Sequence, residues 1–347
     1  MSRSLPAAGL AAELGAEIPV IAAPMAGGPS TPELVLAAAS AGGIGFLAGG
    51  YKTAEQLAEE IAQVRSETSR FGVNLFVPNP VPVDPDEYRT YRNALQPWAE
   101  KYRVELPEDP KEDDDAWQDK LHLLRNSPVP VVSFTFGLPD QVTIATLQRA
   151  GSEVLQTVTN AAEARQAEDA AVDGLIVQSS QAGGHSGTWT PHQPLPDTET
   201  LTLVQQIRAV STLPVWAAGG ISTPAAVQEL LSAGAEAAIV GTVLLRTPES
   251  GAHAAHKQAL ADPAHPDPLL TRAFSGRPAR ALRNAFAEEF TASAPLGFPA
   301  LHYLTSPLRR TAAAEGDPTA LNLWAGTGYA AAAAEPAADL LRRLAGE

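Results

Sequence analysis

The sequence predicts an α/β protein that forms a closed (β/α)8 barrel of the TIM type, and three observations favour this fold. Short apolar runs rich in β-branched residues recur along the chain, helical patterns lie between most of them, and the runs are continuously apolar rather than alternating. Continuous apolarity is typical of parallel strands that are buried on both faces. A doubly wound sheet is the alternative, but eight β/α alternations favour the closed barrel. The expected strands cover residues 19–25, 44–48, 71–77, 129–136, 154–158, 175–178, 215–218 and 238–240.

The helices between these strands have recognisable starts. Thr31 precedes Pro32, and Thr223 precedes Pro224, so a hydroxyl able to cap the helix stands before a proline at the first helical position. Each helical pattern then ends near a glycine. The expected helices cover residues 31–41, 53–65, 139–150, 160–171, 200–211 and 223–233.

Two segments interrupt the alternation. Residues 78–127, after the third strand, predict a solvated helical insertion, and we interpret the acidic run 112–115 within it as a solvated face rather than a metal site. Residues 250–347 predict the last barrel helix followed by a C-terminal helical cap, or lid, at the barrel mouth. The expected units are therefore a barrel over 1–249 and a cap over 250–347, with no metal site.

The composition restricts the class of partner. The chain of 347 residues carries a formal net charge of -15, which argues against nucleic acid and against an anionic membrane surface. It contains no cysteine, so disulfides, thiolate metal ligands and a thiol nucleophile are excluded, and redox chemistry would need a bound cofactor. No apolar run reaches the roughly 18 residues that span a bilayer. We expect a cytoplasmic protein, monomeric or homodimeric, that acts on a small molecule.

Glycines follow several of the expected strands, at the end of a barrel where ligands bind. Gly219 and Gly220 follow the seventh strand, and Gly241 and Thr242 follow the eighth. Loops at these two positions commonly bind phosphate through backbone N–H groups, so they predict a mononucleotide phosphate site. The alternative is that they are tight turns only. Neither loop has the pattern of a dinucleotide-binding or Walker sequence.

Other strand ends carry polar or adaptable side chains that could face a ring bound across the mouth. Asn74 lies inside an apolar strand and needs hydrogen-bond partners, either a heterocycle or the neighbouring backbone. Gln178 ends the sixth strand, and its amide could both donate to and accept from a ring edge. Met25 follows Ala23 and Pro24 at the end of the first strand, where it could pack beside the ring or fill the core.

One histidine stands in a glycine-rich loop after the sixth strand. His185 follows Gly183 and Gly184 in the stretch QSSQAGGHSGT. A neutral imidazole could take a proton from a carbon acid, and an imidazolium could hold an anion, although a solvent-facing imidazole in a tight loop is the simpler interpretation. The other histidines lack metal-ligand spacing, and they are His122, His192, His253, His256, His265 and His302.

Eight motifs give the chain a resemblance to a known family. In order, they are APMAGGPSTPEL, FGVNLF, VSFTFG, QAGGHSG, AAGGIS, VGT, AFSGRPAR and LWAGTGY. The chain resembles the nitronate monooxygenases, formerly called 2-nitropropane dioxygenases, over about residues 19–329. The resemblance implies an FMN-binding (β/α)8 barrel that oxidises alkyl nitronates such as propionate 3-nitronate, with nitroalkanes as further candidates. The oxidant would be O2 and the products a carbonyl compound and nitrite.

The resemblance also implies roles for particular residues. The family's histidine matches His185, as the base for neutral nitroalkanes and a positioning group for nitronates. The implied FMN contacts are Asn74, Gln178, Gly183, Gly220, Ile239, Val240, Gly241 and Thr242. The strand-end argument adds Ala23, Pro24, Met25, Gly184 and Gly219 as cofactor contacts. Many relatives have Glu and Arg where this chain has Gln181 and Ser186, so local charge around the histidine is reduced.

The SGRPAR motif supplies candidate contacts for an anionic substrate. Ser275 and Arg277 are candidates for such contacts, and Arg277 together with Arg280 could restore a positive field around a nitronate. The two arginines could equally cap a helix or pair with Glu288 or Glu289.

Two rival functions remain. An NAD(P)H-dependent quinone or enoyl-thioester reductase would use the same FMN barrel, although the sequence shows no nicotinamide dinucleotide fingerprint. A non-enzymatic binding protein is the other, and failure to take up FMN would favour it.

Overall fold

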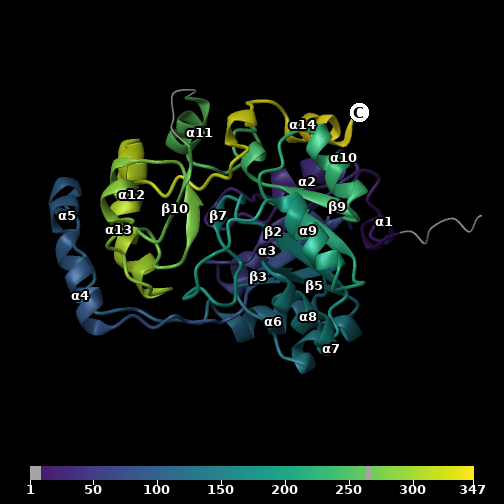
Figure 1. Cartoon of the computed structure of the whole chain (residues 1–347), viewed down its shortest axis with the longest axis horizontal. Coiled ribbons are helices and arrows are strands. Elements are labelled where there is room, and N and C mark those ends of the chain that lie inside the picture. Colours follow the sequence, from purple (N-terminus) through teal and green to yellow (C-terminus); the bar gives the residue numbers. More distant parts are fainter. Residues whose placement is uncertain (1–8, 263–266) are drawn as a thin grey trace, which may run out of the picture.

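A computed structural model describes residues 9–262 and 267–347 and shows a closed barrel of eight parallel strands (Figure 1). The strand order around the barrel is β1-β2-β3-β4-β5-β6-β8-β9. The predicted fold is therefore confirmed, and each predicted run contains the central part of a strand. The strands are β1 Val20–Ala22, β2 Ile44–Ala48, β3 Phe71–Phe76, β4 Val131–Thr135, β5 Glu153–Val158, β6 Gly174–Gln178, β8 Val215–Ala218 and β9 Ala237–Val240.

Eight helices of the described chain form a ring around the barrel, and neighbouring helices of the ring contact each other. The ring consists of α2 Pro32–Ser40, α3 Ala54–Arg65, α6 Trp117–Asn126, α7 Gln141–Ala150, α8 Ala161–Asp169, α9 Thr200–Arg208, α10 Pro224–Ser232 and α14 Ala337–Ala345. The predicted caps are present, since the Thr31 hydroxyl accepts from Leu34 N–H and the Thr223 hydroxyl accepts from Ala226 N–H. The last position, between α10 and α2, is occupied by α14, so the chain leaves the barrel after β9 and returns to close the ring.

The segment expected as a helical insertion has two parts. Its last helix, α6, contacts α3 and α7 and so belongs to the ring. Only α4 Pro85–Ala94 and α5 Gln96–Tyr102 leave the barrel. The expectation of a fully solvated acidic run is wrong at Asp115, whose carboxylate accepts from Tyr51 N–H at 2.8 Å and pairs with the buried Lys120 ammonium at 2.8 Å.

The two excursions from the barrel form a second lobe with its own hydrophobic core, which we call the side lobe: α4 and α5 with residues 245–262 and 267–329. In Figure 1 its helices α4, α5, α12 and α13 lie to the left of the barrel. Tyr91 on α4 is buried there, and its hydroxyl donates to Ala273 O at 2.6 Å. The later segments contribute α11 Ala254–Ala261, α12 Ala285–Phe290, α13 Ala300–Glu315 and η2 Pro318–Ala320. The remaining short elements are α1 Leu10–Glu13, η1 Thr242–Leu244 and η3 Tyr329–Ala331.

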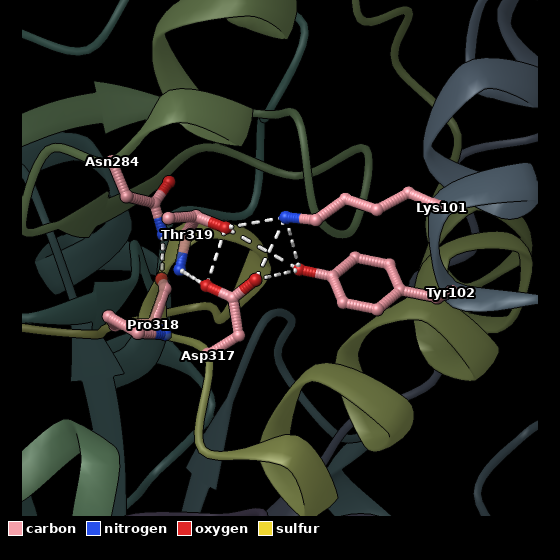
Figure 2. A network of polar contacts seen from close by, with 6 residues as sticks. All are labelled: Lys101, Tyr102, Asn284, Asp317, Pro318 and Thr319. Carbon is pink, nitrogen blue, oxygen red and sulfur yellow. Dashed lines mark hydrogen bonds and ion pairs between the residues drawn. The ribbon is translucent and has the colours of Figure 1, made fainter.

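A polar network joins α5 to the segment after α13 (Figure 2). Lys101 Nζ and the Tyr102 hydroxyl both donate to one oxygen of Asp317, each at 2.8 Å, and Thr319 N–H donates to the other at 2.9 Å. Burial alone would raise the pKa of Asp317, but the hydrogen bonds from Lys101 and Thr319 outweigh it and lower that pKa. The carboxylate is therefore ionised at neutral pH and fixes α5 against η2.

A small antiparallel sheet connects the side lobe to the barrel, and the sequence did not predict it. It contains β10 Leu269–Thr271, β11 Ala279–Ala281 and β7 Gly184–His185 in the order β10-β11-β7. Ala279 pairs with His185, so a strand of the side lobe holds the loop that follows β6. The histidine expected in a glycine-rich loop therefore lies on a paired strand.

Side chains fill the interior of the barrel. Trp216 is fully buried, and its ring meets Phe46 edge to face at 6.2 Å between centroids. Because the interior is packed, space for a ligand is found at the carboxyl ends of the strands. No helix within residues 9–262 and 267–347 has the length and apolar character needed to cross a membrane.

Candidate active site

A cavity of about 550 Å³ opens at the carboxyl ends of the barrel strands, a volume within the range of cofactor sites. One wall comes from the strand ends, and the opposite wall comes from α13 and residues 321–328 of the side lobe. The predicted contacts that line it are Ala23, Pro24, Met25, Asn74, Gln178, Gly183, Gly184, His185, Gly219, Gly220, Ile239, Val240, Gly241 and Thr242. Ser275 and Arg277 lie behind the lining instead.

Glycine is required where the loops after β8 and β9 approach the chain that covers them. Gly220 has a φ of 65°, and a Cβ at this position would lie 2.6 Å from Thr327 Oγ1. Thr327 N–H donates to Gln181 O at 3.0 Å, and Gly326 N–H donates to Thr242 Oγ1 at 3.0 Å, so hydrogen bonds fix residues 326–327 to the loops after β6 and β9.

The amides at these loops are available to an anion. Within the described chain, no acceptor takes the N–H groups of Gly220, Gly241 or Thr242, and Thr242 begins the short helix η1. Unpaired backbone donors beside a helix start are suited to phosphate. This arrangement supports the predicted phosphate site.

Two amide side chains have different freedom in the cavity. Asn74 Nδ2 donates across to β4, at 2.9 Å to Ser133 Oγ and 3.0 Å to Thr135 Oγ1, while Oδ1 has no partner among the described residues. Gln178 Nε2 donates to His185 O at 3.3 Å, and Oε1 accepts from Gly187 N–H at 2.6 Å. Asn74 therefore keeps an acceptor for a ring, whereas Gln178 mainly supports the backbone that carries His185.

His185 has a defined environment rather than a solvent-facing one. Its Nε2 lies 2.8 Å from Ser275 Oγ, and its ring centroid lies 5.1 Å from that of Trp324 and 5.8 Å from that of Phe136. Burial, and then the positive charges of Arg277 and Arg309, lower the pKa of His185 to about 3. The imidazole is therefore neutral at pH 7, which favours the base over the imidazolium interpretation.

Ser275 determines which nitrogen of His185 can act on a substrate. No partner among the described residues binds Nδ1, whereas Nε2 faces the serine hydroxyl. If Nε2–H donates to Ser275 Oγ, Nδ1 carries a lone pair and can accept a proton. Ser275 Oγ lies 3.4 Å from Arg277 O, an acceptor for the hydroxyl proton in that arrangement. Ser275 is thus a positioning residue.

The two arginines of the SGRPAR motif support the His185 loop from behind. The buried Arg277 donates to Ser186 O at 3.4 Å and to Thr188 O, and its guanidinium lies 4.0 Å from the Phe136 ring centroid. Arg280 Nε donates to Ser180 O at 2.7 Å. The suggestion that they pair with Glu288 or Glu289 is wrong, because no ion pair joins either arginine to a glutamate within the described chain and backbone carbonyls accept from Nε and Nη2 of Arg277 and from Nε and Nη1 of Arg280. Burial lowers the pKa of Arg277 to about 9, so it remains charged at pH 7.

Sequence reasoning missed the cavity wall that α13 supplies. His302 stacks on Tyr51 at 4.3 Å between ring centroids, and Arg309 Nη2 donates to His302 O at 2.8 Å. Residues 302, 306 and 309 share a helical face by their spacing of four and three, so helical periodicity could have grouped them. His256 also lines the cavity, and His265 lies outside the described residues.

Buried histidines predict how the stability of the flavin-free protein depends on pH. Burial lowers the pKa of His256 to about 4, and that of His185 to about 3. Between these values and 6.5 the unfolded chain binds protons that the folded protein does not. Stability is then lost as pH falls below 6.5, by about 1.4 kcal/mol per pH unit for each histidine.

Urea unfolding between pH 5 and 8 measures this loss. His256→Gln should remove one histidine's share of the slope that the wild type shows. An unchanged slope in this variant would contradict the assignment.

Comparisons with known proteins place this geometry in a class and then in a family. A (β/α)8 barrel with a glycine-lined mouth and a neutral, half-buried histidine is compatible with an oxidoreductase that binds a flavin. The family model "Nitronate monooxygenase" matches residues 11–347. A "Probable nitronate monooxygenase" of Staphylococcus aureus (strain Newman) is 34% identical over 336 residues, covering 95% of this chain and 94% of the relative. The chain therefore belongs to the nitronate monooxygenase family, which is a family of flavoproteins.

Solved structures agree with this assignment. A nitroalkane oxidase from Streptomyces ansochromogenes is 45% identical, with a TM-score of 0.91 and coverage of 96% of each chain. FabK from Thermotoga maritima is 26% identical, with a TM-score of 0.74, covering 96% of this chain and 93% of that chain. The described residues contain no group of three or more side chains able to hold a metal ion.

Proposed function

We propose that this protein is an FMN-dependent enzyme that oxidises alkyl nitronates with O2 to a carbonyl compound and nitrite. The observation that carries the proposal is the neutral His185 in a glycine-lined cavity. Family membership supports the same reaction class. A cytoplasmic location, a monomeric or homodimeric state and a division near residue 249 remain predictions.

The residues at the mouth fit FMN. The unpaired amides of Gly220, Gly241 and Thr242 would hold its phosphate, and the free Asn74 Oδ1 would accept a hydrogen bond from its ring. Met25 and Ile239 supply apolar contacts at the neighbouring strand ends. When bound, the flavin supplies the electron-transfer chemistry that the side chains of this chain lack.

The charges around His185 suit an anionic substrate. Arg277 is buried and Arg309 is half-buried, and neither forms an ion pair with a carboxylate within the described chain. Burial lowers the pKa of Arg309 to about 10, so both guanidiniums are positive at neutral pH. Their field favours a nitronate, and the neutral His185 would orient it. With a neutral nitroalkane, His185 Nδ1 would remove the proton on the carbon that bears the nitro group.

An anaerobic experiment separates this function from its main alternative, an NAD(P)H-dependent quinone or enoyl-thioester reductase. The FMN-loaded protein is mixed with propionate 3-nitronate in one arm and with NADH in another, and the flavin absorbance is followed. Loss of flavin absorbance with nitronate, followed by O2 uptake and nitrite release on aeration, is expected. Reduction by NADH with the nitronate inert would identify a reductase instead.

A further inference from the structure

A second, smaller pocket lies beside the main cavity and has no role in the arrangement described above. Its volume is about 30 Å³, enough for one or two water-sized molecules. Its lining is mainly apolar and aromatic. Val77 and Phe298 line this pocket but not the main cavity. Asn79 is its one amide, and Asn79 Nδ2 is used by Phe136 O at 2.6 Å and Trp189 O at 3.0 Å. The pocket therefore suits a small apolar molecule.

Three aromatic rings separate this side pocket from the main cavity. Tyr51, Phe76 and Phe136 line both spaces. The centroids of Tyr51 and Phe76 lie 5.5 Å apart, and those of Phe76 and Phe136 lie 4.5 Å apart. The wall is therefore one side chain thick, and one of its rings, Phe136, lies 5.8 Å from the His185 ring between centroids.

Two residues of this wall have unusual backbone conformations. Tyr51 and Phe136 have φ values of 65° and 80°, a region that bulky residues rarely adopt and that concentrates at functional sites. The buried Tyr51 hydroxyl has no hydrogen-bond partner among the described residues, so its ring is held by packing alone. Asp115 fixes only its backbone N–H. The tip of this ring can therefore shift without breaking a hydrogen bond.

The outer edge of the side pocket is acidic. Asp113, Asp114 and Asp115 line the pocket there, while the cations paired with them are Lys111, 3.4 Å from Asp113, and Lys120, 2.8 Å from Asp115. Three carboxylates against two ammonium groups leave an excess of negative charge. An anion such as a nitronate or nitrite is therefore disfavoured at this edge, whereas a neutral molecule is not.

We propose that the side pocket holds dioxygen and supplies it to the main cavity across the Tyr51–Phe76–Phe136 wall. This inference rests on the proposed function, in which O2 is the second substrate. Size, apolar lining and acidic edge together select a small neutral molecule and exclude the ionic reactants. The anionic substrate would enter the main cavity from the α13 side, where the exposed Arg310 lies at its wall.

Xenon and a series of Val77 variants test the pocket. Xenon marks apolar cavities, so pressurised crystals of the FMN-loaded protein should show an anomalous peak beside Val77 and Phe298. Val77→Phe should fill the pocket and slow reoxidation of dithionite-reduced flavin by O2, by about five-fold or more if the pocket is the main path. Val77→Ile should do so to a lesser degree, which keeps the series informative if the larger residue prevents folding. Val142→Ile is the control substitution, because Val142 is 73% exposed and does not line the side pocket.

Each outcome decides the proposal. A xenon peak in the side pocket with graded slowing in the Val77 series supports it, provided that anaerobic reduction by nitronate is unchanged. Xenon confined to the main cavity overturns it, and so does a normal reoxidation rate in variants that no longer bind xenon there. Failure of the wild-type flavin to react with nitronate would contradict the proposed function instead, because the xenon and dithionite measurements need no nitronate.

Discussion

Replacement of His185 by Asn is expected to lower turnover of neutral nitroalkanes by about 100- to 10,000-fold, the usual contribution of a positioned general base. The bound flavin should be retained, because the Asn side chain is smaller and the β7–β11 pairing uses only the backbone. Nitronates already lack the proton that His185 would remove, so their turnover should fall much less. Steady-state kinetics with nitroethane and ethyl nitronate, each at several pH values, measures the difference.

The pH profile and a neighbouring variant give this prediction its controls. A base acts when it is unprotonated, and a pKa of about 3 for His185 means that the free protein shows no loss of kcat/KM near pH 6.5. Ser275→Ala should give an intermediate loss with nitroethane, since it removes the partner of Nε2 and leaves the imidazole in place. Equal losses on nitroethane and ethyl nitronate in the Asn variant would remove proton abstraction from the role of His185.

Gly220→Ala is expected to weaken FMN binding by about 10- to 100-fold, which corresponds to 1–3 kcal/mol of overpacking at this position. The new methyl group would meet Thr327 Oγ1 at 2.6 Å and Gln181 Cβ at 3.1 Å, and the φ of 65° would strain alanine. Residues 326–327 would be pushed away from the loops that offer their amides to phosphate. Titration of the apoprotein with FMN, followed by flavin fluorescence, measures the dissociation constant.

Gly151→Ala is a matched control for that variant. Gly151 also has a positive φ, 101°, and caps α7 at a distance from the cavity, with nothing within 4 Å of the added methyl group. It should therefore cost about 1 kcal/mol of stability through backbone strain while leaving FMN affinity unchanged. A Gly220→Ala protein that binds FMN like the wild type would argue against a phosphate at this loop.

The barrel could be predicted from sequence because each of its strands is buried on both faces. In β1, for example, the side chains of Val20, Ile21 and Ala22 have almost no solvent exposure. A continuous apolar run in the local sequence therefore indicates a strand buried on both faces. The sheet β10-β11-β7 could not be predicted in this way. Its strands have two or three residues each, and pairing between Ala279 and His185 depends on segments about 90 positions apart.

The residues of the candidate site likewise divide into those that the sequence could predict and those that it could not. Its glycines and His185 follow strands, so their common location at one end of the barrel follows from the fold. Arg277 was expected near the substrate, but it lies behind the His185 loop because backbone carbonyls of residues 186 and 188 take up its donors. His302 and Arg309 were missed because nothing in a helical pattern of the late chain indicates that α13 faces the barrel mouth. That information lies in the packing of the side lobe.

The composite origin of the side lobe constrains the order in which this protein can be assembled during synthesis. Helices α4 and α5 are made early, yet the aromatic face they carry is shielded only when residues about 180 to 220 positions later arrive, as in the Tyr91–Ala273 and Lys101–Asp317 contacts. Contacts at such separation form slowly, and exposed apolar surface promotes misassociation in the meantime. The growing chain therefore exposes the aromatic face of α4 and α5 while the later barrel strands are still being synthesised.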